Sequence, residues 1–125
     1  MISQVKNHSH VFVVDPNLDD YRHLVEAFSG DGVGVTVFPS ARAALRHDPQ
    51  NPPDLWVVNM NLPDIDGADL LSMLHGRYPG VPVYLVSDQY RAEEEIHARC
   101  SGAEMYLCKP LQGTWLMTPG MRLAG

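Results

Sequence analysis

The chain has 125 residues, of which 45% are apolar, and this suits one globular domain with its own core. Its 9 basic and 15 acidic residues give a net charge of −6, and no cluster of Lys and Arg is present to neutralise nucleic-acid phosphates. The longest apolar runs, VFVV and VYLV, are too short to span a bilayer, and the N-terminus lacks the apolar stretch of a secretory signal. We therefore expect a cytoplasmic protein that binds neither nucleic acid nor membranes, with Cys100 and Cys108 reduced.

Short apolar runs alternate with longer amphipathic segments along the chain. The runs are rich in β-branched and aromatic residues, which favours strands, and the segments between them have helical spacing. In chain order we predict strand His10–Val14, helix Leu18–Ser29, strand Val33–Phe38, a short helix from the N-cap Ser40 to about His47, strand Asp54–Val58, helix Gly67–Tyr78, strand Val83–Val86, helix Arg91–Cys100 and strand Met105–Cys108.

Apolar stripes indicate which helix faces are buried. In the first helix the stripe consists of Leu18, Tyr21, Val25 and Phe28. In the last complete helix one stripe consists of Ala92, Ile96 and Arg99. The final fifteen residues, LQGTWLMTPGMRLAG, hold at most a short helix at about Leu111–Met117, so one face of the sheet is thinly covered. We expect a flexible N-terminus at 1–8, one domain at 9–117 and a tail at 118–125.

Regular strand–helix alternation predicts parallel strands joined by helical crossovers. The fold class is therefore α/β, a doubly wound sheet of five parallel strands with a short or irregular last helix. In such sheets, ligands bind at the carboxyl ends of the strands. Four polar residues stand at those ends in this sequence: Asp15, Asn59, Ser87 and Lys109.

The segments around these four residues resemble those of a known family. VFVVDPN, VVNMNLPDIDG, VYLVSD and AEMYLCKP occur in the order and at the spacing of the receiver domains of response regulators in two-component signalling. Any one of these segments is a weak signal, but the four together are specific. The resemblance covers roughly residues 9–112 and implies the flavodoxin-like receiver fold.

The resemblance also implies a site. In the family an acidic pair, a phosphoacceptor aspartate and a backbone carbonyl hold Mg²⁺, a lysine contacts the phosphoryl group, and a Ser or Thr and an aromatic residue rearrange on phosphorylation. Each of these family positions has a counterpart in this chain. Asp15 stands at the first acid, Pro16 at the second acid, Asn59 at the acceptor, Asn61 at the backbone carbonyl, Ser87 at the hydroxyl, Tyr106 at the aromatic residue and Lys109 at the lysine. A cis peptide bond between Lys109 and Pro110 is implied as well.

Two of these matches depart from the family pattern. Asn59 carries an amide where a carboxylate nucleophile is needed, and an amide does not accept a phosphoryl group. Pro16 removes an acid, so Asp15 and Lys109 alone sum to zero charge, and Mg²⁺ prefers several carboxylates. We therefore expect no phosphorylation, no metal and no cofactor. Lys109 is expected to pair with Asp15 and to hydrogen-bond Asn59.

Neighbouring acids have simpler interpretations than a relocated acceptor. Asp19 and Asp20 lie in the first turn of the predicted first helix, where negative charge favours the helix dipole. Asp66 precedes Gly67 as a helix N-cap. Asp64 is a weak candidate for a relocated acceptor.

These features favour an atypical receiver domain that acts without phosphorylation as a protein-interaction module and is not an enzyme. Implied partners are a histidine kinase, an output protein, another regulator or a second copy, bound through Arg91–Cys100, Met105–Cys108 and the last segment. A second hypothesis is a regulatory domain that binds a small molecule or anion beside Lys109 and Ser87. A flavin or nucleotide enzyme is disfavoured, because the acidic DPNLDD follows the first strand where a phosphate loop would be needed. Deamidation of Asn59 to Asp is a remote route to a conventional switch.

Overall fold

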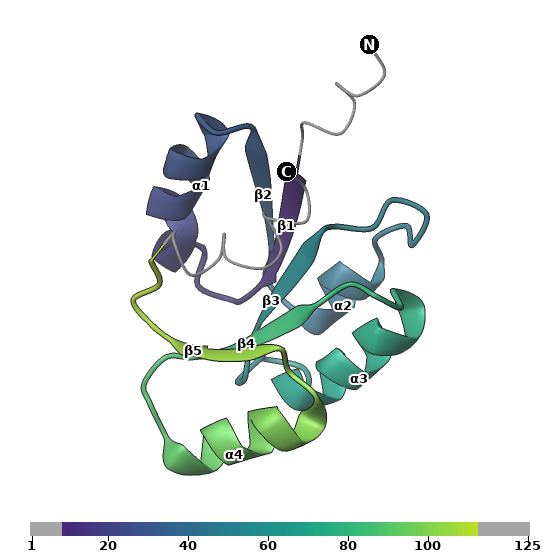
Figure 1. Ribbon diagram of the computed structural model, residues 1–125, viewed down its shortest axis with the longest axis vertical. Coiled ribbons are helices and arrows are strands. Elements are labelled where there is room, and N and C mark those ends of the chain that lie inside the picture. The colour runs from purple at the N-terminus through teal and green to yellow at the C-terminus, as the bar shows by residue number, and fades with distance from the viewer. Residues whose placement is uncertain (1–8, 113–125) are drawn as a thin grey trace.

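The computed structural model describes residues 9–112, and these form a five-stranded parallel sheet flanked by helices (Figure 1). The strand order is β2-β1-β3-β4-β5. The strands are β1 (Ser9–Val14), β2 (Val33–Phe38), β3 (Leu55–Asn59), β4 (Val83–Ser87) and β5 (Met105–Cys108). The predicted doubly wound α/β fold is confirmed, and each predicted strand lies within one residue of its observed bounds.

Helices cover both faces of this sheet. The helices are α1 (Arg22–Ser29), α2 (Ala41–Leu45), α3 (Gly67–Arg77) and α4 (Ala92–Ser101), and a 3₁₀ turn at Leu18–Tyr21 precedes α1. Figure 1 shows α1 on one side of the sheet and α2, α3 and α4 on the other. Because each crossover returns the chain to a parallel strand, all the strands end at the same edge of the sheet.

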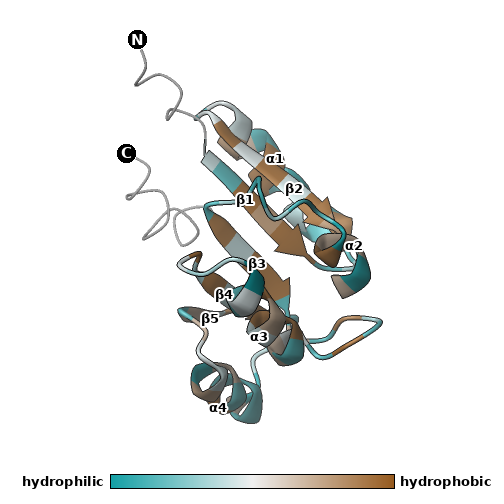
Figure 2. Cartoon of the chain, turned by 90° about the vertical axis from the view of Figure 1, so that its right-hand side faces the viewer, coloured by the Kyte–Doolittle hydropathy of each residue, from teal (hydrophilic) through white to brown (hydrophobic). Residues whose placement is uncertain are grey.

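The two central strands explain why the sheet forms. Every residue of β3 and of β4 is buried, and Figure 2 shows apolar colouring along the sheet. Strands covered on both faces read as nearly continuous apolar runs, as LWVV and VYLV do. In these two strands the polar residues Asn59 and Ser87 therefore stand at the carboxyl end.

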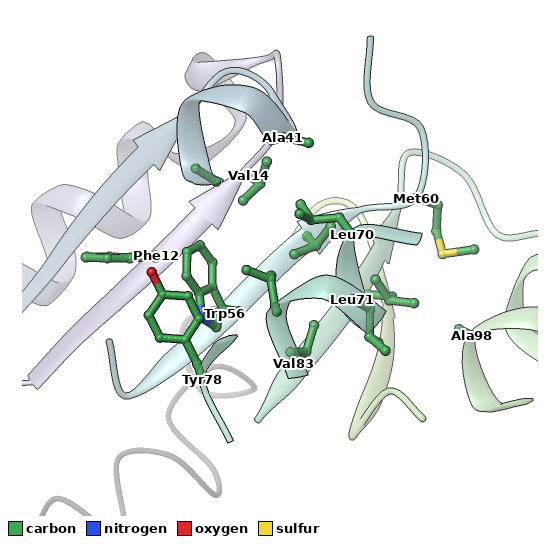
Figure 3. Packing of buried hydrophobic residues seen from close by; sticks show 14 residues of the cluster. Phe12, Val14, Ala41, Trp56, Met60, Leu70, Leu71, Tyr78, Val83 and Ala98 are labelled. Carbon is green, nitrogen blue, oxygen red and sulfur yellow. The ribbon is translucent and has the colours of Figure 1, made fainter. Parts of the chain in front are cut away.

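Large aromatic side chains fill the core beneath α2 and α3 (Figure 3). The ring centroids of Phe12 and Trp56 lie 5.3 Å apart in an edge-to-face arrangement, and those of Trp56 and Tyr78 lie 5.2 Å apart. Such pairs add about 0.5–1.5 kcal/mol beyond the area they bury. The opposite face has a separate core, in which Tyr21, Leu24 and Phe28 pack on the sheet.

The two predicted helix stripes were wrong in part. Leu24 is buried, whereas Val25 is 36% exposed, because the 3₁₀ turn before α1 has three residues per turn and shifts the helical phase. On α4, Ile96 is 62% exposed and Ala98 is fully buried. The small side chain of Ala98 allows α4 to approach its neighbours closely, and Ile96 points to solvent.

Gly67 fixes the loop between β3 and α3. A Cβ atom at this position would lie 2.2 Å from the Asn59 carbonyl oxygen and 2.8 Å from the Met60 Cα. The Gly67 N–H donates to the Met60 carbonyl at 2.9 Å, and Asp66 caps α3 by accepting from the Ala68 N–H at 3.0 Å. The start of α3 is therefore held against the end of β3, and the predicted N-cap role of Asp66 is confirmed.

The last predicted helix, Leu111–Met117, falls largely outside the described residues. Leu111 is buried in irregular chain and Gln112 is exposed, and the remaining positions, with 1–8 and 118–125, lie beyond the part of the chain that the structure describes. Within residues 9–112 no helix has the length and apolar character needed to cross a membrane.

Candidate functional site

A cleft of about 440 Å³ opens at the carboxyl edge of the sheet. We call it, with the adjacent end of β3, the strand-end pocket. The cleft is lined by Asp15, Pro16, Asn17, Asp20, Asp88, Lys109 and Pro110. Asp15 follows β1, Asn59 ends β3, Ser87 ends β4 and Lys109 follows β5, so the fold brings together the four polar residues that the sequence placed at strand ends.

Lys109 lies at the centre of the pocket. Its ammonium nitrogen lies 2.9 Å from Asp15 Oδ2, 2.6 Å from Asp20 Oδ2 and 2.7 Å from Asp88 Oδ1. The Lys109 side chain is only 11% exposed. Burial opposes the charge of this amine, but the three carboxylates outweigh burial and raise the pKa of Lys109. The ammonium is therefore charged and fully paired at neutral pH.

Asp15 is the buried acid of the pocket, and its side chain is 1% exposed. Besides Lys109, its Oδ2 accepts from the Tyr21 hydroxyl at 2.8 Å and from Asn59 Nδ2 at 2.9 Å. Its Oδ1 accepts from the Asn17 N–H at 2.9 Å. Burial and the neighbouring Asp15 carboxylate raise the pKa of the Tyr21 hydroxyl, so Tyr21 remains a hydrogen-bond donor.

Both the nitrogen and the oxygen of the Asn59 side-chain amide form hydrogen bonds within the protein. Its Nδ2 donates to Asp15 Oδ2 and, at 3.1 Å, to Asp88 Oδ1. Its Oδ1 accepts from the Asn61 N–H at 2.7 Å. The predicted hydrogen bond to Lys109 was wrong, because the acids take the amide N–H groups and the loop after β3 takes the oxygen.

Two residues of the pocket were missed by sequence reasoning. Asp20 was assigned to a helix terminus, but the 3₁₀ turn directs it at Lys109, and nothing in the sequence indicated that turn. Asp88 directly follows Ser87, so the strand-end rule would have found it if extended by one residue. With Asp15, Asp20, Asp88 and Lys109 together the formal charge is −2, not the zero inferred from Asp15 and Lys109 alone.

The absence of a Mg²⁺ site stays a prediction, but the acids here are arranged differently from the site that the resemblance implies. Mg²⁺ needs carboxylate oxygens that converge on a near-octahedral position, whereas the three carboxylates here converge on an ammonium. Pro16 offers no side-chain oxygen. Among residues 9–112, no group of three or more Asp, Glu, His or Cys side chains is placed to hold a metal ion.

A second hydrogen-bonded group links the pocket edge to α4 and β5. The Ser87 hydroxyl donates to the Glu94 carboxylate and accepts from the Tyr106 hydroxyl at 2.9 Å. The Tyr106 oxygen also accepts from the Arg91 N–H at 3.3 Å, and Asn61 Nδ2 reaches Glu94 at 3.4 Å. Burial raises the pKa of Tyr106, which keeps its hydroxyl a donor. Glu94 was not singled out from the sequence.

The loop after β3 places its remaining acid away from the pocket. Asp64 accepts from the backbone N–H groups of Ala41 at 3.1 Å and Arg42 at 2.8 Å, so it holds the start of α2. The Lys109–Pro110 peptide bond is cis.

Comparisons with known proteins identify the family. The model of the response regulator receiver domain family matches residues 11–118, and the chain therefore belongs to that family. Receiver domains are signalling modules of two-component systems that interact with kinases and other regulators.

Similar proteins include transcriptional regulators. The chain is 30% identical over 102 residues to the KDP operon transcriptional regulatory protein KdpE of Escherichia coli, covering 82% of this chain and 45% of that protein. It is 30% identical over 100 residues to the transcriptional regulatory protein PrrA of Mycobacterium tuberculosis, covering 80% of this chain and 43% of that protein. The chain thus spans less than half the length of these curated relatives.

Among solved structures, the receiver domain of the Francisella response regulator 1452 is similar, with a TM-score of 0.78 and 26% identity over 94% of this chain and 97% of that one. A response regulator receiver domain protein from Methanospirillum hungatei has a TM-score of 0.80 at 20% identity, covering 94% of each chain, and shares the fold.

Proposed function

We propose that this receiver domain works without aspartyl phosphorylation, as a protein-interaction module in two-component signalling. The observation that carries the proposal is the bonding of Asn59. This residue matches the acceptor position in the sequence, and its amide N–H groups are committed to Asp15 and Asp88. A group that donates to two acids presents no nucleophile to an incoming phosphoryl group.

Lys109 supports the same conclusion. A lysine that contacts a phosphoryl group needs an ammonium that can turn toward the incoming anion. The Lys109 ammonium instead contacts three carboxylates at 2.6–2.9 Å, and these give the pocket a formal charge of −2. An anion would have to displace these carboxylates from Lys109, which disfavours the alternative of an anion-binding regulatory domain.

Glu94 lies beside the two residues that correspond to the family's rearranging pair, Ser87 and Tyr106. In the family, as the resemblance implies, the hydroxyl residue and the aromatic residue rearrange when a phosphoryl group appears. In this chain the Ser87 hydroxyl already donates to the Glu94 carboxylate, and Tyr106 already donates to Ser87. We infer that Glu94 holds Ser87 and Tyr106 in one arrangement, so the domain presents one constant α4–β5 surface.

That surface is the expected contact for a kinase, an output protein, another regulator or a second copy. It includes a groove of about 370 Å³ lined by Tyr90, Glu95, Met105, Tyr106, Leu107 and Cys108. Of these, Tyr90 is 59% exposed, and exposed aromatic side chains of this kind often anchor protein interfaces. We expect no enzymatic activity and a cytoplasmic setting.

The proposal is tested by amide NMR titration with Mg²⁺, followed by Mg²⁺ plus beryllofluoride, a mimic of the aspartyl phosphate. We expect no saturable shift at Asp15, Asn59, Ser87 or Lys109 of the wild-type protein. The matched control is Pro16→Asp/Asn59→Asp, which restores both missing acids and is expected to show saturable shifts. Circular dichroism checks that the control variant is folded.

The opposite result has a clear meaning. Saturable shifts in the wild-type protein that start at Lys109 and spread to Tyr106 would show that an anion or metal still drives the switch. Incorporation of phosphate from acetyl phosphate into the wild-type protein would refute the proposal directly.

A further inference from the structure

A second cleft lies on the opposite side of α3 from α4, between α2 and α3. Its volume is about 440 Å³, and it is lined by Ala41, Arg42, Leu45, Arg46, Asp64, Ile65 and Met73. We call it the α2–α3 groove. Figure 1 shows α2 and α3 on the same face of the sheet. The groove residues come from both helices and from the loop after β3.

The floor of the groove is apolar. Met73 is 47% exposed on α3, and Leu45 and Ile65 are half-buried. The groove stays open because α2 has only five residues and ends at Leu45. A large apolar side chain inserted here would be removed from water by contacts with all three residues, which stabilises a complex by about 25 cal/mol for each Å² of apolar surface buried.

The rim of the groove is basic, in contrast to the rest of this acidic chain. Arg42 and Arg46 are four residues apart and therefore share one side of the α2 segment. Arg77 reaches the same place from α3, where its guanidinium donates to the Leu45 carbonyl at 2.7 Å. Two arginines, Arg42 and Arg46, thus line a groove that contains one carboxylate, Asp64, which already accepts from two backbone N–H groups.

These arginines lack carboxylate partners. Within residues 9–112, Arg22, Arg99 and Lys109 form ion pairs with Asp or Glu. Arg42, Arg46 and Arg77 form no ion pair with any residue in that range, although Asp and Glu outnumber Lys and Arg 15 to 9 in the chain. Arginine is suited to binding carboxylates in pairs of parallel hydrogen bonds.

We propose that the α2–α3 groove is a docking site for an acidic segment of a partner protein, with one or two large apolar side chains flanked by Asp or Glu. The apolar side chains would contact Leu45, Ile65 and Met73, and the flanking carboxylates would pair with Arg42 and Arg46. Neither chain segment outside the described residues fits this role, because 1–8 and 113–125 contain no Asp or Glu.

This docking site goes beyond the proposed function, because it lies away from the strand-end pocket and does not require that pocket to be inert. Nucleic acid is a poorer fit, since the floor is apolar and the chain has a net charge of −6. The two proposals fail separately: the beryllofluoride titration reports on Lys109 and Tyr106, whereas docking reports on Arg42, Arg46 and Met73.

The test uses a displayed library of twelve-residue peptides, selected on the full wild-type chain. Selected peptides are then synthesised and mapped by amide NMR. We expect enrichment of sequences that combine Asp or Glu with Leu, Phe, Met or Trp, and shifts confined to Ala41–Arg46, Ile65 and Met73. Arg42→Glu/Arg46→Glu should weaken binding at least tenfold. Met73→Ala, which changes an exposed side chain, should weaken it several-fold.

The matched control is Arg91→Glu, which reverses an exposed arginine that also has no ion pair in the described range but lies at the start of α4. It should leave peptide affinity unchanged. If circular dichroism shows that Arg42→Glu/Arg46→Glu is unfolded, Arg42→Gln/Arg46→Gln is used in its place. This variant should also weaken peptide binding. Absence of enrichment, equal affinity for the arginine variants, or shifts at Tyr90 and Tyr106 would overturn the proposal. Self-association of the wild-type chain that the arginine changes abolish would also overturn it, in favour of a second copy.

Discussion

The strand-end pocket and the α2–α3 groove have the same volume, about 440 Å³, but they use charge in opposite ways. In the strand-end pocket, one lysine is surrounded by three carboxylates within 2.9 Å, so the charges satisfy one another. In the groove, the two lining arginines, Arg42 and Arg46, lack carboxylate partners among residues 9–112. A site whose charges are all paired internally contributes to the fold, and a site with unpaired charges is available to another molecule.

The largest expected effect separates these two roles. Lys109→Met keeps most of the aliphatic stem but leaves Asp15 buried beside Asp20 and Asp88 without a cation. Removing one partner of a buried ion pair costs about 3–5 kcal/mol. Arg46→Met removes an exposed charge with no ion pair in the described range, so its cost should stay within about 0.5 kcal/mol. Urea unfolding of both variants measures the two values.

Equal destabilisation by Lys109→Met and Arg46→Met would contradict the proposed difference between the strand-end pocket and the groove. It would mean that the carboxylates of the strand-end pocket relax into water once the lysine is lost. The double variant Asp20→Asn/Asp88→Asn in the Lys109→Met background tests the explanation. It should recover part of the loss, because it removes two of the three uncompensated charges.

Two glycines in α3 give the next largest contrast. At Gly67 a methyl group would meet the Asn59 carbonyl oxygen at 2.2 Å, so Gly67→Ala must displace the backbone beneath the strand-end pocket. Overpacking of this kind costs about 1–3 kcal/mol. At Gly76 an added methyl group would have open space within 4 Å, and Gly76→Ala should stabilise the protein by about 0.5–1 kcal/mol through helix propensity. Thermal unfolding of the two variants should therefore shift in opposite directions.

The fold was predictable from the sequence because its signals are strong and local. LWVV and VYLV are apolar throughout, and Asp66 and Ser40 cap their helices as predicted, with Ser40 accepting from the Ala43 N–H at 3.2 Å. The strand-end rule then placed Asp15, Asn59, Ser87 and Lys109 together without any knowledge of side-chain contacts.

The bonding inside the site was less predictable, because it depends on side-chain direction. Asp20 joins Lys109 only because a 3₁₀ turn precedes α1, and Glu94 reaches Ser87 only because α4 packs closely through Ala98. Both depend on tertiary packing, which sequence spacing does not report. The α2–α3 groove was missed for a related reason: its residues come from three separate segments, and α2 is shorter than its apolar pattern indicated.

Glu94 tests how far the strand-end region extends toward α4 and β5. Glu94→Ala removes the acceptor of the Ser87 hydroxyl, and a lost hydrogen bond to a charged group costs about 1.5–3 kcal/mol. The matched control is Glu93→Ala, an exposed neighbour with no side-chain hydrogen bond in the described range, which should change stability little. Amide shifts of Tyr106 and Arg91 should move in Glu94→Ala and not in Glu93→Ala. An unmoved Tyr106 would show that Glu94 does not hold the Ser87–Tyr106 arrangement.

The smallest expected effect concerns the pKa values of two acids, Asp88 in the strand-end pocket and Asp64 in the α2–α3 groove. The hydrogen bond and charge of Lys109 lower the pKa of Asp88. At Asp64 partial burial opposes ionisation, but the backbone N–H groups of Arg42 and Ala41 outweigh it and also lower the pKa. A carboxyl whose folded pKa is below the unfolded value stabilises the protein above the unfolded value, here 3.8, and loses that contribution as the pH falls through the folded value.

Asp88→Asn and Asp64→Asn should therefore each flatten the loss of stability below about pH 4, by less than about 1 kcal/mol because both acids are exposed. The salt dependence of the two effects distinguishes the causes of the two lowered pKa values. An ion pair with Lys109 is screened, so 0.5 M NaCl should shrink the Asp88 effect, whereas hydrogen bonds from backbone N–H groups should keep the Asp64 effect largely intact. Urea unfolding of both variants between pH 2.5 and pH 6, at low and high salt, makes the measurement. If salt reduced both effects equally, the charges of the nearby arginines would be what lowers the pKa of Asp64. Those arginines would then already be paired with Asp64 inside the groove.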